Sequence, residues 1–408
     1  MDNLATNKRS ESKSVASYYL LRFLLACCLL LVPGCGAYDD EFDDTFAENG
    51  SGETAVLPPT STNDADLDIN SLFTEIVAYV AAEMEEEEIP GAAIALIHGP
   101  DTILADGLGL RNLDANAPVT TNTLFHIASA SKPLTSFLIA TLVEQGQLDW
   151  DQPLSQISSD ISPSDEPITL RHLLTMTSGL PEDVGEDIDH DTEVFPTFNQ
   201  TRRTASPGDT FQYSNLAYAV AGYLAVQVAH NQANSLYDGY AQLMQERIFS
   251  PLNMNTATIY FSEARRQTDY ARAYAWHNGR LVEEPGDDYD GDPLAPSGAI
   301  KASALDMAQF IALQLNEGVT SAGQRIISAD ILHETWQPVH EGYGLGWQIE
   351  QYEATTVIYH TGFFDNFAAV IGFLPEYNLG FVLLTNAETG IDLTDEAPFA
   401  LVDLLLNP

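Results

Sequence analysis

Basic residues are scarce in this chain. Its 408 residues include 16 Lys and Arg against 59 Asp and Glu, a formal net charge of -43 at pH 7. This charge would repel a phosphate backbone, and the sequence has no basic stripe to bind one. Nucleic acid is therefore excluded as a partner, and we interpret the acidic surface as a solubility feature.

Cysteines and long apolar runs are also scarce. The three cysteines all lie near the N-terminus, at positions 27, 28 and 35, so the rest of the chain has neither disulfides nor thiol chemistry. The apolar run 23–34 follows a basic leader, and it is shorter than the about 20 residues that a membrane-spanning helix needs. It fits an export signal. We therefore predict a signal peptide at residues 1–34 and a location in the periplasm or cell envelope.

The end of this leader suggests how the protein is attached. Val32-Pro33-Gly34-Cys35 resembles a bacterial lipobox, whose cysteine is lipidated after cleavage. This resemblance implies a lipid anchor at Cys35 and contact with a membrane through it. Plain secretion is the alternative, because Pro33 departs from the usual small or β-branched residue. Leu24-Leu25-Ala26-Cys27 is a second candidate box, with almost no apolar run before it.

Residues 35–69 are acidic and rich in Gly, Pro, Ser and Thr. Such a composition cannot bury a core, so it favours a disordered tether. A folded domain is predicted to follow at residues 70–408.

The domain has strand patterns at both ends and helices between them. Strands are predicted at 92–99, 102–110, 343–350, 355–362, 367–378 and 379–386, and the first two form a hairpin. Helices are predicted at 71–87, at 131–147, over much of 150–310, and from about Asp395. Strands from both ends predict one antiparallel sheet that both termini complete. The fold class is therefore α+β, with helices flanking the sheet and a helical insertion.

The chemistry begins at Ser129-Ala130-Ser131-Lys132. Pro133 is tolerated in a helix only in the first turn, so it predicts a helix start near Ser129. Ser129 and Lys132 then lie side by side on one helix face. A serine hydroxyl needs an adjacent base to act as a nucleophile, and a desolvated lysine can supply one. The spacing alone is a weak signal, because Ser10 to Lys13 in the leader repeats it.

Two later segments supply the context. Tyr213-Ser214-Asn215 precedes an apolar stretch, and His360-Thr361-Gly362 ends a predicted strand. In this order, Ser-x-x-Lys, Tyr-x-Asn and x-Thr-Gly resemble the serine β-lactamase and penicillin-binding protein superfamily. The Tyr-x-Asn form is similar to the branch of class C β-lactamases, esterases and D-amino-acid peptidases. Residues 168–180 and 296–311 also resemble this branch, and the resemblance covers roughly residues 72–408.

The resemblance implies a β-lactamase/transpeptidase-like fold and a role for each matched residue. Ser129 would be the acylated nucleophile, and Lys132 its proton partner. Tyr213 would be the general base or proton shuttle, and which of Lys132 and Tyr213 is the principal base stays open. Asn215 would orient Lys132 and the substrate amide. The backbone N–H groups of Ser129 and Phe363 would form the oxyanion hole. No cofactor is implied.

His360, Thr361 and Gly362 are implied to contact the substrate. Many family members have lysine at the place of His360, where it helps to hold a substrate carboxylate. Histidine is mostly neutral near pH 7, so that grip is weakened here.

We therefore predict a serine hydrolase that cleaves a small-molecule or peptide substrate, an ester, an amide or a D-residue peptide, through an acyl-enzyme. The alternatives are a true class C-like β-lactamase or D-Ala-D-Ala carboxypeptidase, and a non-catalytic cell-wall- or acyl-binding relative. The four retained polar residues, Ser129, Lys132, Tyr213 and Asn215, argue against the last.

No metal site is predicted. The histidines show no His-Glu-x-x-His spacing, so His126 and His172 are expected to be structural. The acidic loop 286–292 lacks the spacing and the terminal glutamate of an EF-hand, so we expect a solvated loop. The chain also has no Gly-x-Ser-x-Gly elbow, which disfavours an α/β-hydrolase.

Overall fold

A computed structural model describes residues 67–407, apart from residues 101, 183, 186, 230–234, 285 and 287. The predicted signal peptide, the anchor at Cys35 and nearly all of the tether lie outside the described residues. Within the described part of the chain, no helix combines the length and the apolar character that crossing a membrane requires.

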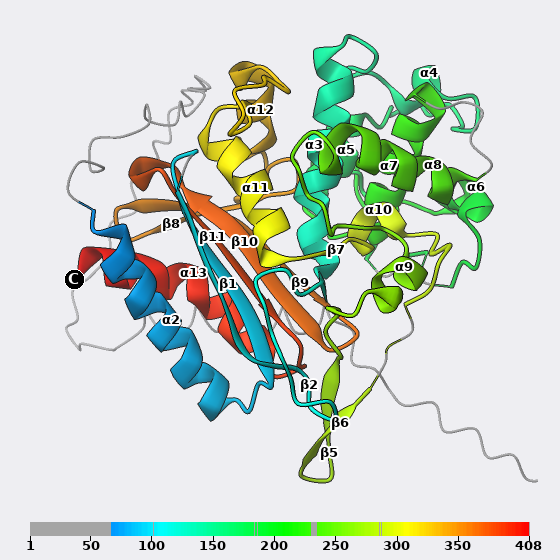
Figure 1. Cartoon of the computed structure of the whole chain (residues 1–408). Helices are drawn as coiled ribbons and strands as arrows, with labels where there is room; N and C mark the ends of the chain where they lie inside the picture. The colour runs from blue at the N-terminus through cyan, green and yellow to red at the C-terminus, as the bar shows by residue number, and fades with distance from the viewer. Residues whose placement is uncertain are drawn as a thin grey trace, which may run out of the picture. The chain divides into compact units, whose positions relative to one another are not determined.

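One sheet of seven antiparallel strands organises the domain, in the order β3-β2-β1-β11-β10-β9-β8 (Figure 1). The strands are β1 (Gly91–His98), β2 (Thr102–Asn112), β3 (Ala117–Pro118), β8 (Gln348–Tyr352), β9 (Thr355–Phe364), β10 (Phe367–Leu374) and β11 (Leu379–Thr385). β1 pairs with β11, with Ala92 opposite Thr385 and His98 opposite Leu379. The predicted α+β fold, with one antiparallel sheet that both ends of the domain complete, is confirmed.

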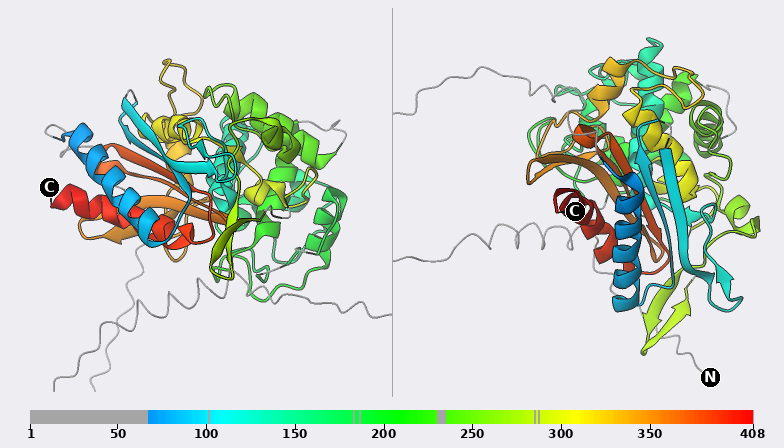
Figure 2. Two further views of the ribbon diagram at one scale, coloured as in Figure 1. Left: turned by 60° about the horizontal axis from the view of Figure 1, so that its bottom comes forward. Right: turned by 60° about the vertical axis from the view of Figure 1, so that its left-hand side comes forward.

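Helices cover both faces of this sheet (Figures 1 and 2). On one face lie α2 (Ile69–Glu86) and α13 (Gly390–Leu406), and on the other lies α11 (Ala304–Leu315). Successive strand residues point to opposite faces. Leu96 of β1 accordingly joins the core under α2 and α13. Because both faces are buried, the inner strands are continuous apolar runs.

The helical region stands beside the sheet (Figure 1). Its helices are α3 (Lys132–Glu144), α4 (Leu154–Ile157), α5 (Leu170–Leu174), α6 (Val194–Gln200), α7 (Asn215–Ala229), α8 (Leu236–Met244), α9 (Phe261–Arg266), α10 (Ala295–Gly298) and α12 (Ala329–Thr335). Short helical turns are η2 (Ala128–Ser131), η3 (Asp191–Glu193), η4 (Gln245–Phe249) and η5 (Pro375–Tyr377). Two small strand pairs join β4 (Phe125–His126) to β7 (Lys301–Ala302), and β5 (Tyr274–His277) to β6 (Arg280–Glu283). At the centre, α3 and α7 are buried around most of their circumference, as helices without a polar face are.

Several local predictions differ from the structure, and the strand predicted at 343–350 is β8, which begins only at Gln348. The helix predicted at 131–147 is the turn η2 followed by α3, which ends at Glu144, although its start near Ser129 is confirmed. The last helix begins at Gly390 rather than near Asp395. Its first turns bury Leu393 and Thr394, but the acidic residues among them conceal the helical spacing of apolar residues in the sequence.

The acidic loop 286–292 is not solvated throughout. The Asp288 side chain is only 6% exposed, and its Oδ2 lies 2.7 Å from Lys301 Nζ. The expectation of a solvated loop is wrong at this residue. The partner charge comes from β7, and no local pattern signals such a contact.

Candidate active site

Residues 127–132, which we call the Ser129 turn, carry the predicted nucleophile. The turn leaves β4, passes through η2 and enters α3, where Pro133 occupies the first helical turn. Ala128 has a φ of +48°, a conformation that a residue with a side chain keeps only when its surroundings hold it. The Ile127 N–H donates to the Ile300 carbonyl at 3.0 Å. The backbone before Ser129 is thus held in place by strand β7 and by Ile300, the residue that precedes β7.

Lys132 lies wholly inside the protein, with 0% of its surface exposed. Its Nζ is 2.9 Å from Ser129 Oγ, 2.9 Å from Asn215 Oδ1 and 2.9 Å from the Ser297 carbonyl oxygen. The predicted contact of Lys132 with Ser129 is therefore present. Burial lowers the pKa of the Lys132 amine well below its ordinary value of 10.5, since the charged form is disfavoured away from water.

Tyr213 approaches the same amine from the loop that leads into α7. The Lys132 Nζ lies 4.7 Å from the centroid of the Tyr213 ring. Asn215, two residues later, is the first residue of α7, which aims its amide at Lys132. Three predicted residues, from two helices and a loop, therefore meet around one nitrogen atom.

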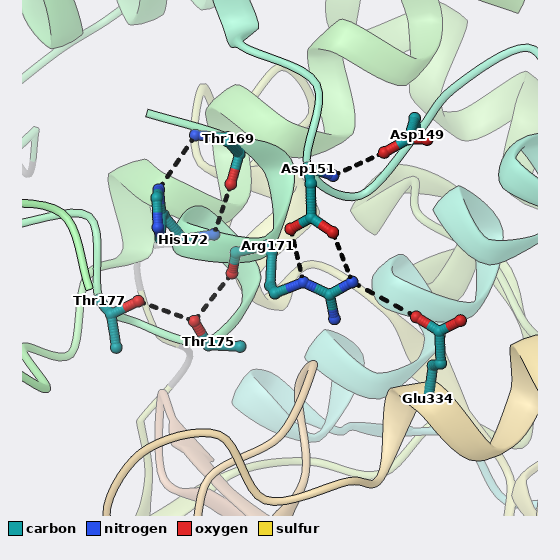
Figure 3. Close-up of polar contacts among 8 residues, drawn as sticks. All are labelled: Asp149, Asp151, Thr169, Arg171, His172, Thr175, Thr177 and Glu334. Carbon is teal, nitrogen blue, oxygen red and sulfur yellow. Dashed lines mark hydrogen bonds and ion pairs between the residues drawn. The ribbon is translucent and has the colours of Figure 1, made fainter. Parts of the chain in front are cut away.

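The Tyr213 loop rests on the segment that follows α5. Met176, with a φ of +60°, accepts the Gln212 N–H at its carbonyl (2.8 Å) and the Ser214 N–H at its Sδ (3.3 Å). Thr175 Oγ1 lies 2.9 Å from Thr177 Oγ1, on either side of Met176 (Figure 3). Hydrogen bonds therefore hold the backbone beside Tyr213 against the segment that contains Met176, and a further hydrogen bond stabilises that segment itself.

Arg171 in α5 anchors this support (Figure 3). Its guanidinium donates two bonds to Asp151, at 2.7 and 3.0 Å, and one to Glu334 of α12 at 3.4 Å. The hydrogen bond to Arg171 lowers the pKa of the Asp151 carboxyl. His172 Nδ1 accepts the Thr169 N–H at 3.2 Å, which caps α5 and fits the structural role expected for this histidine.

His360 on β9 is buried and neutral. Its Nδ1 lies 2.6 Å from the Thr361 carbonyl oxygen. A carbonyl can only accept, so Nδ1 carries the proton. Nε2 therefore accepts from the Tyr343 hydroxyl at 3.1 Å. Burial and the nearby charge of Lys132 lower the pKa of His360 to about 3, against the effect of the Thr361 carbonyl. Both ring nitrogens are thus occupied within the protein.

Gly362 lets β9 pass directly against the Ser129 turn. A methyl group on its Cα would lie 2.3 Å from the Ile127 oxygen and 2.9 Å from the Ser129 nitrogen. β8 pairs with β9 only as far as Tyr359. Beyond that residue, the edge of β9 that β8 leaves uncovered contacts the Ser129 turn. The amide of Ser129 therefore lies at the edge of β9, next to the residue that precedes Phe363.

Three groups near the Ser129 turn have no clear signal in the sequence. Ser297 contributes only its carbonyl, which any residue type could supply. Tyr343 is a buried tyrosine outside every motif. His126, expected to be structural, accepts a backbone hydrogen bond inside the Ser129 turn itself. In the described part of the chain, no cluster of His, Cys, Asp and Glu is arranged to hold a metal ion.

Comparison with known proteins agrees with this arrangement. A family model described as Beta-lactamase matches residues 76–405, which is most of the chain. The chain belongs to the β-lactamase family. The match covers the whole sheet, the helical region and every predicted site residue of the folded domain. The superfamily resemblance seen in the sequence is confirmed.

Relatives of the chain are distant. An unguisins hydrolase, ungD', of Aspergillus campestris is 27% identical over 353 residues, which cover 81% of this chain and 64% of that protein. Protein flp of Staphylococcus aureus (strain MW2) is 25% identical over 342 residues, with coverages of 80% and 64%. The chain thus spans 64% of the length of these two relatives.

Two solved structures share the fold. The octameric penicillin-binding protein homologue of Pyrococcus abyssi has a TM-score of 0.69 at 27% identity, over 83% of this chain and 78% of that one. A β-lactamase/D-alanine carboxypeptidase of Pseudomonas syringae has a TM-score of 0.69 at 21% identity, over 82% and 98%. The predicted β-lactamase/transpeptidase-like fold is therefore confirmed.

Proposed function

We propose that this protein is a serine hydrolase that works through an acyl-enzyme on Ser129. The observation that carries the proposal is the set of three contacts at 2.9 Å around the buried Lys132 Nζ. The Asn215 Oδ1 and Ser297 carbonyl oxygens can only accept hydrogen bonds. A neutral Lys132 amine therefore donates to these two and turns its lone pair to the Ser129 hydroxyl. That is the geometry of a base beside its nucleophile.

The reaction follows from this arrangement. Ser129 Oγ attacks the substrate carbonyl carbon while its proton passes to the neutral Lys132 amine. Tyr213 then gives its own proton to the leaving group and regains one from Lys132, whose charge stabilises the phenolate in between. The backbone N–H groups of Ser129 and Phe363 stabilise the oxyanion. The leaving group departs with the proton as its bond to the carbonyl carbon breaks. Water then attacks the acyl ester, which releases the acid and restores the Ser129 hydroxyl.

The proposed substrate class rests on His360. A neutral histidine with both nitrogens engaged offers no cation to a substrate carboxylate. The net charge of -43 also repels anions over longer range. Uncharged esters and amides, including D-residue peptides without a free carboxylate at the binding position, are therefore the favoured substrates. Asn215, Thr361 and Gly362 are proposed to contact the substrate.

The test of this proposal uses a fluorophosphonate probe and p-nitrophenyl esters. Ser129→Ala should abolish covalent labelling and turnover, and Lys132→Ala should suppress acylation nearly as much. Tyr213→Phe keeps the ring, so its loss of about 10² to 10⁴ in rate reports the phenol alone. Because the three residues act as one unit, their effects should be far from additive. Ser250→Ala, at an exposed serine, is the matched control. An active Ser129→Ala enzyme, with no acyl adduct on the wild type, would overturn the mechanism.

The same purified protein separates the alternative functions. A true β-lactamase hydrolyses nitrocefin, and a carboxypeptidase releases D-alanine from a peptide that ends in D-Ala-D-Ala. A non-catalytic binder turns over none of these substrates and takes no covalent probe. Faster turnover of neutral esters and D-amino-acid amides than of either carboxylate substrate is the result that we expect.

We also propose that the protein is exported and anchored by a lipid on Cys35. Support comes from the basic leader, the apolar run 23–34 and the lipobox-like segment. Cys35→Ser should move the protein from the membrane fraction to the soluble fraction, while deletion of residues 36–65 should leave hydrolysis intact. A wild-type protein that is already soluble after export would contradict the anchor.

A further inference from the structure

His126 reaches into the Ser129 turn from β4. Its Nδ1 accepts the Ala128 N–H at 3.0 Å. Ala128 is the left-handed residue that directly precedes Ser129. The direction of the Ser129 amide and side chain depends on the backbone angles of Ala128, so this hydrogen bond acts on the predicted nucleophile through a single residue.

The contacts of His126 determine its tautomer. A nitrogen that accepts a hydrogen bond carries no proton, so the proton of the neutral ring is on Nε2. Nε2 lies 3.5 Å from Asp288 Oδ2, and the same oxygen lies 2.7 Å from Lys301 Nζ. Burial, together with the Lys301 charge, lowers the pKa of His126 well below its ordinary value, which keeps Nδ1 available as an acceptor.

This buried cluster of His126, Asp288 and Lys301 joins segments that are far apart in the sequence. His126 and Lys301 are paired in the β4–β7 ladder. His126 is 3% exposed and Lys301 is 0% exposed. Lys301 Nζ also donates a hydrogen bond to the Ile259 carbonyl at 3.3 Å. A charge this deep persists only with a partner and further hydrogen bonds. Asp288 supplies the partner charge.

The cluster also contacts the far end of β9. The Asp288 N–H donates to Asp365 Oδ2 at 2.9 Å, in the turn between β9 and β10. The His126 ring lies 5.1 Å, centroid to centroid, from that of Phe364. Phe363, whose amide is proposed for the oxyanion hole, lies immediately before Phe364. The cluster thus contacts a neighbour of each proposed oxyanion-hole amide, the backbone of Ala128 before Ser129 and the ring of Phe364 after Phe363.

We propose that His126, held by Asp288 and Lys301, is a positioning residue that fixes Ala128 and so aligns the hydroxyl and amide of Ser129 for acylation. This inference rests on the proposed function, because it concerns the same serine. It differs from a structural role in one respect. A core histidine supports stability only, whereas a positioning residue determines the rate of acylation at constant stability.

Two variants at one position separate the acceptor from the ring. His126→Asn keeps an acceptor, since an Asn side chain readily accepts from the N–H two residues ahead and should stay within about fivefold of wild type. His126→Phe keeps a ring against Phe364 but has no acceptor. We expect its kcat and its rate of fluorophosphonate labelling to fall about 10²-fold, as for a misplacement of about 1 Å at a reacting centre. KM should change little. His277→Phe, at an exposed histidine of the β5–β6 hairpin, is the matched control.

The outcomes are distinct. A His126→Phe protein that is labelled as fast as wild type overturns the inference, and so does a His126→Asn protein that is as slow as His126→Phe. An unlabelled wild type refutes the proposed function instead.

If circular dichroism shows that His126→Phe does not fold, the half-buried Asp365 takes its place. Asp365→Ala removes the acceptor for Asp288, and Asp365→Asn keeps one. We expect Asp365→Ala to be labelled about tenfold more slowly than Asp365→Asn, a smaller loss than at His126, because Asp365 acts on the His126 ring only through Asp288. Equal rates for this pair would overturn the inference.

Discussion

Gly362→Ala adds a single methyl group, and the structure gives the distances that determine its effect on rate and stability. The new Cβ would lie 2.3 Å from the Ile127 oxygen, 2.8 Å from the Ala130 nitrogen and 2.9 Å from the Ser129 nitrogen. All three are backbone atoms, so no side chain can rotate away. Ordinary van der Waals contact begins about 1 Å farther out, so β9 and the Ser129 turn must separate by roughly that distance.

This separation acts on rate and stability together. A misplacement of about 1 Å at a reacting centre can reduce the rate about 10²-fold. Overpacking of this kind typically destabilises a protein by about 1 to 3 kcal/mol. We therefore expect Gly362→Ala to lose about 10² in kcat on a p-nitrophenyl ester and to unfold at a lower urea concentration, while remaining folded.

Gly298→Ala provides a matched control beside the same turn. Its nearest neighbour would be the Ala128 carbonyl carbon at 3.6 Å, an ordinary contact. Its effect on the free energy of unfolding should stay within about 0.5 kcal/mol. A Gly362→Ala enzyme with wild-type kcat would refute the close approach of β9, as would equal damage from both substitutions.

Three further predictions concern charge. The folded-state pKa of His360 is about 3, so between that pH and about 6.5 only the unfolded chain gains this proton. Stability falls there by about 1.4 kcal/mol per unit of decreasing pH, and His360→Asn should make urea unfolding that much less steep in pH. The depressed pKa of Lys132 makes stability rise as the pH increases towards 10.5, and Lys132→Met should flatten that rise when unfolding is followed from pH 8 to 10. Arg171→Met breaks a pair whose Asp151 side chain is 66% exposed, so it should lower the free energy of unfolding by about 1 kcal/mol or less, and by less still in 1 M salt. An unchanged slope in either of the first two cases, or a salt-independent loss in the third, would contradict the corresponding reasoning.

The sequence by itself determined the chemistry that is local along the chain. Ser129 and Lys132 lie one helical turn apart, and Pro133 fixes where that turn begins, so their contact needs no tertiary information. Apolar runs at both ends of the domain likewise determined the antiparallel sheet, because strands buried on both faces show in composition alone.

Only the tertiary structure decided what surrounds that pair. Asn215 and Ser297 reach Lys132 from 83 and 165 residues away along the chain. The buried ion pair of Lys301 with Asp288 overturned the expectation of a solvated loop. The same ion pair contacts His126, whose ring accepts the Ala128 N–H two residues ahead. Helical and strand periodicities report only neighbours within a few residues, whereas these contacts depend on how β4, β7 and β9 pack around one turn.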